Sequence, residues 1–223
     1  LSTDRPKITY QNIKIPITNI KIYTELNKIF NSKVEISQIT FGVEDFKIQE
    51  IQKIAIRIKP SNFKTYLLNN INGGKIEKAL FDVSIDKDFK ITDYKANGSI
   101  KNINGAIKNN FILKNISFNF IIDKNLTLIN SVNARYKGIF ISNGSINLQR
   151  EEEINIKGNF NSQFDLKEYQ LNELFEKVKF FKENKIKTKG SLLHSFYLKM
   201  NNNFKIIDYD YKSSGNISEA EAV

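Results

Sequence analysis

One hairpin pattern that occurs three times restricts the fold of this chain more than any other feature. Its copies lie at residues 81–93, 118–130 and 196–208. In each copy apolar residues alternate with other residues, three residues drawn from Asp, Asn and Lys follow, and the alternation then resumes. A period of two indicates strands with one apolar face, and Asp and Asn favour tight turns. Units of this kind bury their apolar faces only by stacking, so the sequence predicts an array of hairpins.

Further alternating segments extend the pattern beyond the three copies. Short runs between residues 6 and 58, the last of them at 54–58, predict several strands in the N-terminal part. The expected fold class is therefore mainly β, with an elongated, curved antiparallel sheet of repeated hairpins. The strands expected in the central part are 76–85, 89–100, 111–122, 126–136, 139–149 and 153–160.

The curvature is expected from a second recurring pattern, in which a glycine precedes Ser or Asn and then an apolar residue. Glycine weakens an ordinary strand, so its recurrence at such steps predicts bulges or bends. The glycines concerned are Gly98, Gly144, Gly158, Gly190 and Gly215.

One principal helix is expected at residues 165–182. Asp165 and Glu168 match the first and last positions of a capping box. Packing against the sheet is the main expectation for this helix, and contact with a membrane surface is the alternative. Its apolar residues at helical spacing are Leu171, Leu174, Phe175, Val178 and Phe181.

Two shorter helical segments are also expected. Ser61 or Asn62 can cap a short helix, and Gly73-Gly74 is a suitable place for it to end. Residues 23–30 can form a helical turn or two. These features divide the chain into an N-terminal β segment with short helices (1–74), a hairpin repeat region (75–160), and a helix followed by a further hairpin repeat (161–223).

The net charge of +10 is compatible with binding to nucleic acid or to an anionic membrane. However, only four of the 34 basic residues are arginines, and Lys, Asn and Ile are abundant throughout, as A/T-rich codons would produce. Most phenylalanines also fall on the apolar side of the strands, where they cannot stack on exposed bases. We therefore expect no nucleic-acid partner.

The sequence contains few residues in catalytic or metal-binding patterns. His194 is the only histidine and has no carboxylate at ligand spacing, so a structural or solvent-facing role is expected. The glutamates at 151–153 are typical of a solvated turn, and the Asp and Asn residues of the repeated turns lack the glycine and distal Glu of a calcium loop. The chain contains no cysteine. The sequence thus favours a protein that is not an enzyme and holds no metal or cofactor.

The order of segments resembles the AsmA-like family of bacterial envelope proteins, and most closely its YhdP- and TamB-type repeat regions. A Pro-containing step at Lys59-Pro60 leads through a short helix to Gly74-Lys75-Ile76. Alternating hairpins follow, with a step at 136–146, then a helix and a closing segment at 187–193. The resemblance covers roughly residues 34–217 and lies in residue types rather than in a diagnostic motif.

This resemblance implies a taco-shaped β-sheet whose hydrophobic groove carries phospholipid acyl chains between the inner and outer membranes. It also implies a location in the periplasm of a Gram-negative bacterium, with an inner-membrane anchor in a region outside this chain. We accordingly expect the chain to be an internal fragment of a longer protein. Protein partners are not predicted.

The residues expected to line such a groove occupy equivalent positions in the three hairpin copies. They alternate along each strand, so stacking of the copies would place them on one face. They are Val83, Ile85, Phe89, Ile91, Phe118, Phe120, Ile122, Leu126, Leu128, Phe196, Leu198, Phe204 and Ile206.

Two other functions fit the same pattern. One is a structural or adhesive β-repeat domain, in which the apolar stripes form an ordinary closed core. The other is an assembly factor for outer-membrane proteins, which would offer a sheet edge to client strands. The residue pattern alone does not separate an open groove from a closed core.

Overall fold

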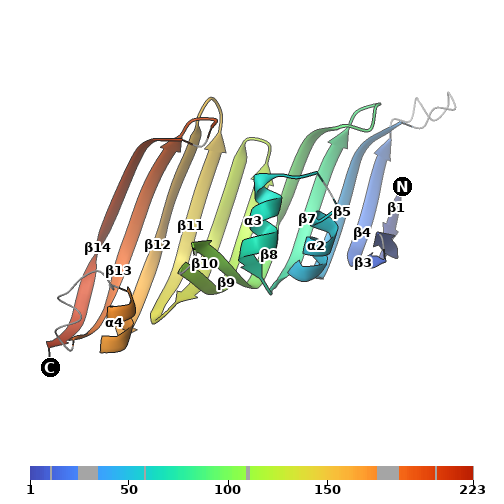
Figure 1. The fold of residues 1–223 in the computed structure, drawn as a ribbon. Helices are drawn as coiled ribbons and strands as arrows, with labels where there is room; N and C mark the ends of the chain where they lie inside the picture. Colours follow the sequence, from blue (N-terminus) through green and yellow to red (C-terminus); the bar gives the residue numbers. More distant parts are fainter. Residues whose placement is uncertain are drawn as a thin grey trace.

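The computed structural model describes residues 1–10, 12–24, 35–57, 59–108, 111–174, 186–203 and 205–222. They form one twelve-stranded antiparallel sheet that is not closed, a separate two-stranded sheet and three helices (Figure 1). The mainly β fold class predicted from the sequence is confirmed.

The order of strands in the large sheet is β1-β4-β5-β7-β8-β9-β10-β11-β12-β13-β14, and β6 pairs with β8. From β7 onward each strand pairs with its neighbours in sequence, as an array of hairpins requires. The strands are β1 (Ser2–Asp4), β2 (Ile8–Tyr10), β3 (Ile13–Ile15), β4 (Ile17–Thr24), β5 (Ile36–Lys47), β6 (Ile71–Asn72), β7 (Lys75–Ile85), β8 (Ile91–Lys108), β9 (Phe111–Asp123), β10 (Leu126–Tyr136), β11 (Ile139–Arg150), β12 (Ile154–Leu166), β13 (Ile186–Met200) and β14 (Ile206–Ala222).

The strand expected at 54–58 is wrong. Helix α2 (Ile48–Ala55) occupies most of this region, and its buried residues Ile48 and Ala55 are two helical turns apart on one face. Ile56, which contributed to the apparent alternation, ends the helix and is exposed. A short apolar run fits both periods, and here the helical one prevails.

Helix α3 (Asn62–Asn70) begins as predicted. The Ser61 hydroxyl accepts a hydrogen bond of 3.1 Å from the backbone N–H of Lys64. Its end differs from the prediction, because the chain passes directly from Asn70 into β6. Gly73 and Gly74 instead form the turn between β6 and β7, with left-handed φ angles of 66° and 79°.

Helix α4 (Glu168–Leu174) lies within the predicted helix 165–182, but the predicted capping box is wrong. Asp165 belongs to β12, and the backbone N–H of Lys167 donates a hydrogen bond of 2.9 Å to the side chain of Gln170. The expected residues Phe175, Val178 and Phe181 lie outside the described residues, as does most of the helical turn expected at 23–30, whose first two residues belong to β4.

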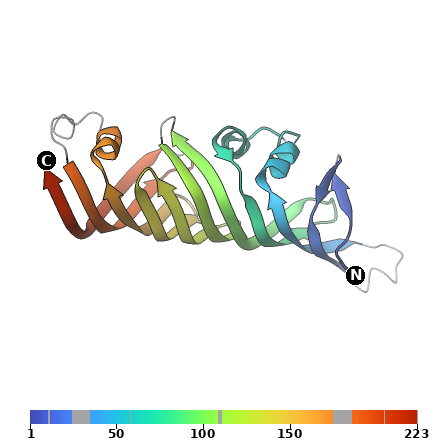
Figure 2. The same cartoon turned by 90° about the horizontal axis from the view of Figure 1, so that it is seen from below.

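The large sheet is bent into a trough, and α2, α3 and α4 lie on the same side of it (Figures 1 and 2). Left-handed residues interrupt neighbouring strands at Asp45, Asn102, Asn115, Ser131 and Asn143. The register shifts in the four strand pairs from β8–β9 to β11–β12. Because such bulges bend a strand and increase its twist, this series accounts for the curvature.

The predicted curvature is therefore present, but glycine is not its main source. Gly144 follows the bulge at Asn143 and Gly190 lies at a register shift between β13 and β14, whereas Gly98 and Gly158 have regular partners in Ala79 and Phe196. Asn and Asp tolerate the left-handed region better than most residues, which is why they can form bulges without glycine.

The sheet runs continuously through the expected domain boundaries. The boundary at 74/75 lies at the start of β7, and the boundary at 160/161 falls inside β12. β5 pairs with β7, and β12 pairs with β13 along its whole length.

Candidate functional site

The two faces of the sheet differ in chemistry. Residues that pair across an antiparallel ladder point to the same face, so chains of pairs trace rows across the sheet. One such row crosses from β4 to β14 without a charged residue. It consists of Ile17, Val43, Ala79, Gly98, Phe120, Ile129, Ile146, Gly158, Phe196 and Tyr211.

The next row on this face, which we call the inner face, is almost as apolar. Its two polar side chains are Thr127, whose hydroxyl accepts a hydrogen bond of 3.1 Å from Arg150, and Tyr209. The row consists of Ile20, Phe41, Phe81, Ala96, Ile122, Thr127, Leu148, Ile156, Leu198 and Tyr209.

The opposite, outer face is largely polar. A row that alternates with the two above contains charged, amide and glycine residues beside a few exposed apolar ones. It consists of Asn19, Gly42, Leu80, Asn97, Ile121, Leu128, Asn147, Lys157, Tyr197 and Asp210. The sheet is thus amphipathic along its full width.

In the N-terminal half of the inner face, side chains from neighbouring strands pack against one another. Phe120 is 8% exposed and forms a buried cluster with Val43, Ala79 and Ala96. The rings of Phe41 and Phe81 stack beside it with their centroids 4.9 Å apart.

The C-terminal half of the inner face contains an open cavity of about 810 Å³. Its wall comes from β11 to β14 and from the apolar side of α4, with Phe111 and Tyr136 stacked at one side. The lining residues are Phe111, Tyr136, Ile139, Ile141, Phe160, Ser162, Phe164, Leu166, Leu171, Leu174, Ile186, Thr188, Leu192, His194, Ile217, Ala220 and Glu221.

Helix α4 covers this cavity. Leu171 is 3% exposed, and Leu174 lines the cavity as well, so the prediction that these two residues face the sheet is confirmed. On the other side of the helix Glu173 forms a salt bridge of 3.0 Å with Lys137. This pair raises the pKa of Lys137, with the Glu173 hydrogen bond as the main cause.

Truncation of Leu171 should therefore destabilise the protein. We expect Leu171→Ala to lower the free energy of unfolding by about 3 kcal/mol, because it removes a fully buried side chain and leaves a void. Urea denaturation measures this value. Tyr169→Ala, on the exposed side of the same helix, is the control and should change stability by less than about 0.5 kcal/mol. Equal effects of the two substitutions would mean that α4 does not dock on the sheet.

A chain of polar groups crosses the cavity wall. Ser162 Oγ lies 2.7 Å from His194 Nε2, and His194 Nδ1 lies 2.6 Å from the Tyr211 hydroxyl, so three neighbouring strands contribute one group each. The ring of Phe160 stacks on His194 with a centroid distance of 4.4 Å. Both ring nitrogens are engaged and the side chain is buried, which agrees with the structural role expected for His194.

Burial lowers the pKa of His194 from its ordinary value of 6.5. The folded protein therefore binds this proton more weakly than the unfolded chain does. The contribution of His194 to the free energy of unfolding is fully present above the pKa of this histidine in the unfolded chain, and it decreases as the pH falls below that pKa.

A direct test uses the fact that His194 is the only histidine. We expect its single imidazole resonance in NMR spectra to titrate below pH 6.5, and the free energy of unfolding to fall over the same range. His194→Gln should lose this part of the pH dependence. Titration at or above the ordinary value would contradict the burial of the imidazole.

Most residues predicted for the groove lie on the inner face. Six of them belong to the central parts of the strands, and three flank the turns, where Ile85 pairs with Ile91 and Met200 pairs with Ile206. The nine residues are Val83, Ile85, Ile91, Phe118, Phe120, Ile122, Phe196, Leu198 and Ile206.

The placement of Leu126, Leu128 and Phe89 on the same face is wrong. Leu128 pairs with Ile121 and Asn147, which puts it on the outer face, and Leu126 pairs with Gln149 on that side. Phe89 lies in the turn with a left-handed φ of 58° and is 74% exposed. Phe204 lies outside the described residues.

These residues differ from the prediction because the turns of the three hairpins are not alike. In the first hairpin Asp86 bonds to the backbone of Asp88 and Lys90, so the turn includes Phe89. The third hairpin repeats these bonds from Asn201. In the second hairpin Asp123 bonds to Asn125 and Leu126, and pairing resumes at Thr127 opposite Ile122.

The strands between the hairpin copies were predicted, but none of their residues was included in the predicted groove. β11 and β12 supply a large share of the cavity wall, including Ile139, Ile141 and Phe160. Their alternation was visible, but they lie outside the three copies on which the site prediction was based.

The chemistry available at this site is that of an apolar surface. In the described ranges no group of three or more His, Cys, Asp or Glu residues could hold a metal ion. Among the described helices, none has the length and apolar character required to cross a bilayer. Comparison with family models, curated proteins and solved structures gives no match for this chain.

Proposed function

We propose that the inner face carries the acyl chains of phospholipid and that the protein acts without catalysis. The observation that supports this most strongly is the row from Ile17 to Tyr211, which crosses the trough without a charged side chain. Covering such a surface with hydrocarbon is favourable by roughly 25 cal/mol for each Å² removed from water.

The shape of the sheet supports the same proposal. In the described part of the chain, three short helices and the small sheet β2-β3, whose Ile15 packs against the Phe120 cluster, cover parts of the inner face, and no large second sheet does (Figure 2). At the far edge Tyr211 remains 58% exposed although it continues the apolar row. An apolar face that its own chain leaves partly open is suited to a ligand that supplies the missing hydrocarbon.

The cavity beneath α4 supports a ligand of lipid chemistry. Its volume of about 810 Å³ falls within the range of ligand sites, and its lining is mostly aliphatic and aromatic. Of its few polar groups, Ser162, Thr188 and His194 are uncharged or favour the uncharged form, and the charged Glu221 is exposed near the end of β14.

The resemblance to AsmA-like proteins supports the cellular setting that we propose. In this setting the chain is part of a longer envelope protein of the YhdP or TamB type, located in the periplasm and anchored in the inner membrane by another region. It carries phospholipid between the inner and outer membranes.

Each alternative function has one observation in its favour. The buried cluster around Phe120 is what a closed structural domain would contain. The long edge strand β14 (Ile206–Ala222) pairs with β13 alone in the described sheet, and its other edge could receive a client strand.

Site-specific cross-linking separates these functions. A photoreactive phenylalanine analogue at Phe196, on the inner face, should capture phospholipid in cells, whereas the same analogue at the neighbouring Tyr197, on the outer face, should not. Both positions are half-buried aromatic residues of β13, so they are closely matched. Equal capture at the two positions, or none at either, would count against the proposal. Capture of polypeptide along β14 instead of lipid would favour the assembly factor.

A further inference from the structure

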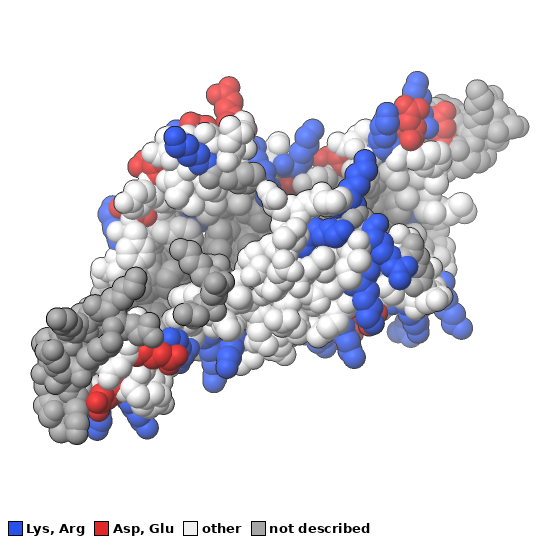
Figure 3. All heavy atoms as spheres, in the orientation of Figure 1, with Lys and Arg blue, Asp and Glu red and all other residues white. Residues whose placement is uncertain are grey.

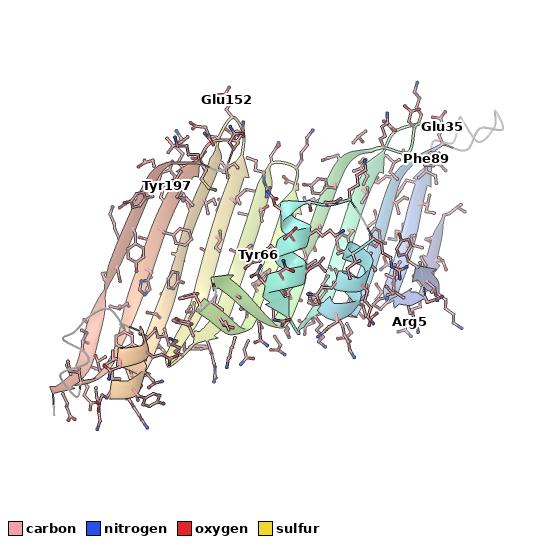
Figure 4. The ribbon with its side chains drawn as sticks, in the orientation of Figure 1. Arg5, Glu35, Tyr66, Phe89, Glu152 and Tyr197 are labelled. Carbon is pink, nitrogen blue, oxygen red and sulfur yellow. The ribbon has the colours of Figure 1, made fainter. Side chains whose placement is uncertain are left out.

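The two long edges of the trough differ in charge. The turns 86–90, 124–125, 151–153 and 201–205 lie together along one edge, which we call the turn rim. The opposite ends of the strands form the other edge, and α2, α3 and α4 extend from it over the inner face (Figure 1); we call this edge with its helices the helix rim. In Figure 4 Glu35, Phe89 and Glu152 mark the turn rim, and Arg5 marks the helix rim.

The turn rim has no basic excess. The turn 86–90 contains two Asp and two Lys residues, and the turn 151–153 consists of three glutamates. Lys124 follows Asp123 directly. Among the described residues of these turns, acidic side chains match or outnumber basic ones at 86–90 and 151–153, whereas 124–125 and 201–205 each contain one lysine and no acidic residue.

The helix rim is basic in its N-terminal half. Residues 5–7 contain Arg5 and Lys7 without an acidic residue, and the segment 48–70 carries Lys53, Arg57, Lys59 and Lys64 against Glu50 alone. The strand ends add, on the outer side of the sheet, a row of pairs formed by Lys47, Lys75 and Lys101. Figure 3 shows basic side chains along this edge and over the segment that contains α2 and α3. Around α4 and the C-terminal strand ends, acidic residues are at least as numerous as basic ones: Asp165, Glu168, Glu173, Glu219 and Glu221 lie there with Lys137, Lys167, Lys187 and Lys189.

Codon composition does not explain this asymmetry. A general preference for lysine would raise the positive charge of both rims alike. Placing lysines opposite one another on adjacent strands is also unfavourable, because like charges that face each other across a ladder repel. Asp45 and Glu77 offset part of this repulsion through salt bridges to Lys75 and Lys101.

Large apolar side chains are exposed at the turn rim, as Ile56, Tyr169 and Ile217 are at the helix rim. Phe89, Ile91, Ile206 and Ile207 all lie in or beside the turns and are more than half exposed. The two rims therefore differ in charge and not in the presence of exposed apolar side chains.

We propose that phospholipid lies across the trough with its headgroup at the N-terminal half of the helix rim and its acyl chains directed towards the turn rim, and that the preferred ligand is an anionic phospholipid. This inference rests on the proposed function. Each lysine near an anionic headgroup surface contributes attraction corresponding to about a fivefold change in binding.

Two photoreactive lipids test the orientation. One is a phosphatidylethanolamine whose amine is acylated with a diazirine, and the other is a phosphatidylglycerol with a diazirine at the end of an acyl chain, so both carry one negative charge. Each is supplied to the protein in phosphatidylcholine vesicles, and labelled peptides are identified by mass spectrometry. We expect the headgroup probe to label the N-terminal half of the helix rim and the acyl probe to label the inner face and the turn rim.

The outcomes separate the two proposals. If the acyl probe labels the inner face but the headgroup probe labels both rims equally, or mainly the turn rim, the orientation is overturned and the proposed function stands. If the acyl probe does not label the inner face, the proposed function itself fails.

Charge reversal tests the preference for anionic lipid. Lys47→Glu combined with Lys59→Glu alters the helix rim, and Lys87→Glu combined with Lys124→Glu makes the same change at the turn rim; all four side chains are exposed. We expect the first variant to bind phosphatidylglycerol about fivefold more weakly for each lysine, with phosphatidylcholine binding unchanged. The second variant should bind both lipids as the unaltered protein does. Equal losses in the two variants, or no loss in the first, would overturn the preference.

Discussion

Phe120→Asp is expected to lower the free energy of unfolding by about 4 kcal/mol. The substitution removes a buried aromatic side chain, which typically costs about 3–5 kcal/mol. It also places a carboxylate in the cluster formed with Val43, Ala79 and Ala96, where no polar partner is present among the described residues. Urea denaturation followed by circular dichroism measures the change.

Asn119→Asp is the matched control for this substitution. Asn119 is the preceding residue on the same strand, lies on the outer face and is exposed, so the same carboxylate there remains in water. Its effect should be below about 0.5 kcal/mol. Similar stability of the two variants would mean that the N-terminal half of the inner face is as open as the C-terminal half.

Leu192→Asp is expected to reduce lipid binding by at least about tenfold while leaving the sheet folded. Leu192 lines the cavity beneath α4, and its pairing partners are Ser162 and Gly215. A carboxylate at this position would have to leave water when hydrocarbon fills the cavity, which costs several kcal/mol. Phospholipid bound per protein, measured after organic extraction, gives the result.

The neighbouring leucine supplies the control. Leu193 is 54% exposed on the outer face, so Leu193→Asp introduces the same side chain one residue away without entering the cavity. Its lipid binding should equal that of the unaltered protein. If both variants bind lipid equally, the cavity does not hold the acyl chains.

The strands could be predicted from the sequence because the physical signal is local. Alternation along a strand reports which face is buried, and the strands from β7 to β12 begin and end within a few residues of the expected limits, except where β8 and β12 extend further. Helix α2 was not predicted because a short apolar run such as Ile54 to Ile56 is compatible with both the strand period and the helix period. The packing of this segment against the sheet decides between helix and strand.

The site was less predictable because it depends on turn geometry. The first and third hairpins place Lys90 and Lys205 after their turn residue, and the second hairpin has Thr127 at the equivalent position. Thr127 lies on the inner face, so the second hairpin has shifted by one residue and its leucines have moved to the outer face. A shift of one residue moves every side chain of the strand to the opposite face of the sheet. The threonine at the position occupied by lysine in the other two hairpins was the sequence feature that indicated this shift.

The origin of the curvature was not predicted from the sequence. Glycine was expected to provide the bends, yet Asp45, Asn102, Asn115, Ser131 and Asn143 provide the left-handed positions. Asn is so common in this chain that no single one stood out. Their alignment across neighbouring strands becomes evident only when the strands are paired.

The most direct test of the central claim is native mass spectrometry of the purified protein after removal of lipid and incubation with vesicles of phosphatidylethanolamine and phosphatidylglycerol. The measured quantity is the mass bound to the folded chain. An apolar inner face that holds acyl chains predicts additional mass equal to one or more phospholipid molecules, and the loss of this mass in Leu192→Asp. A folded protein that retains only its own mass at every lipid concentration would contradict the claim.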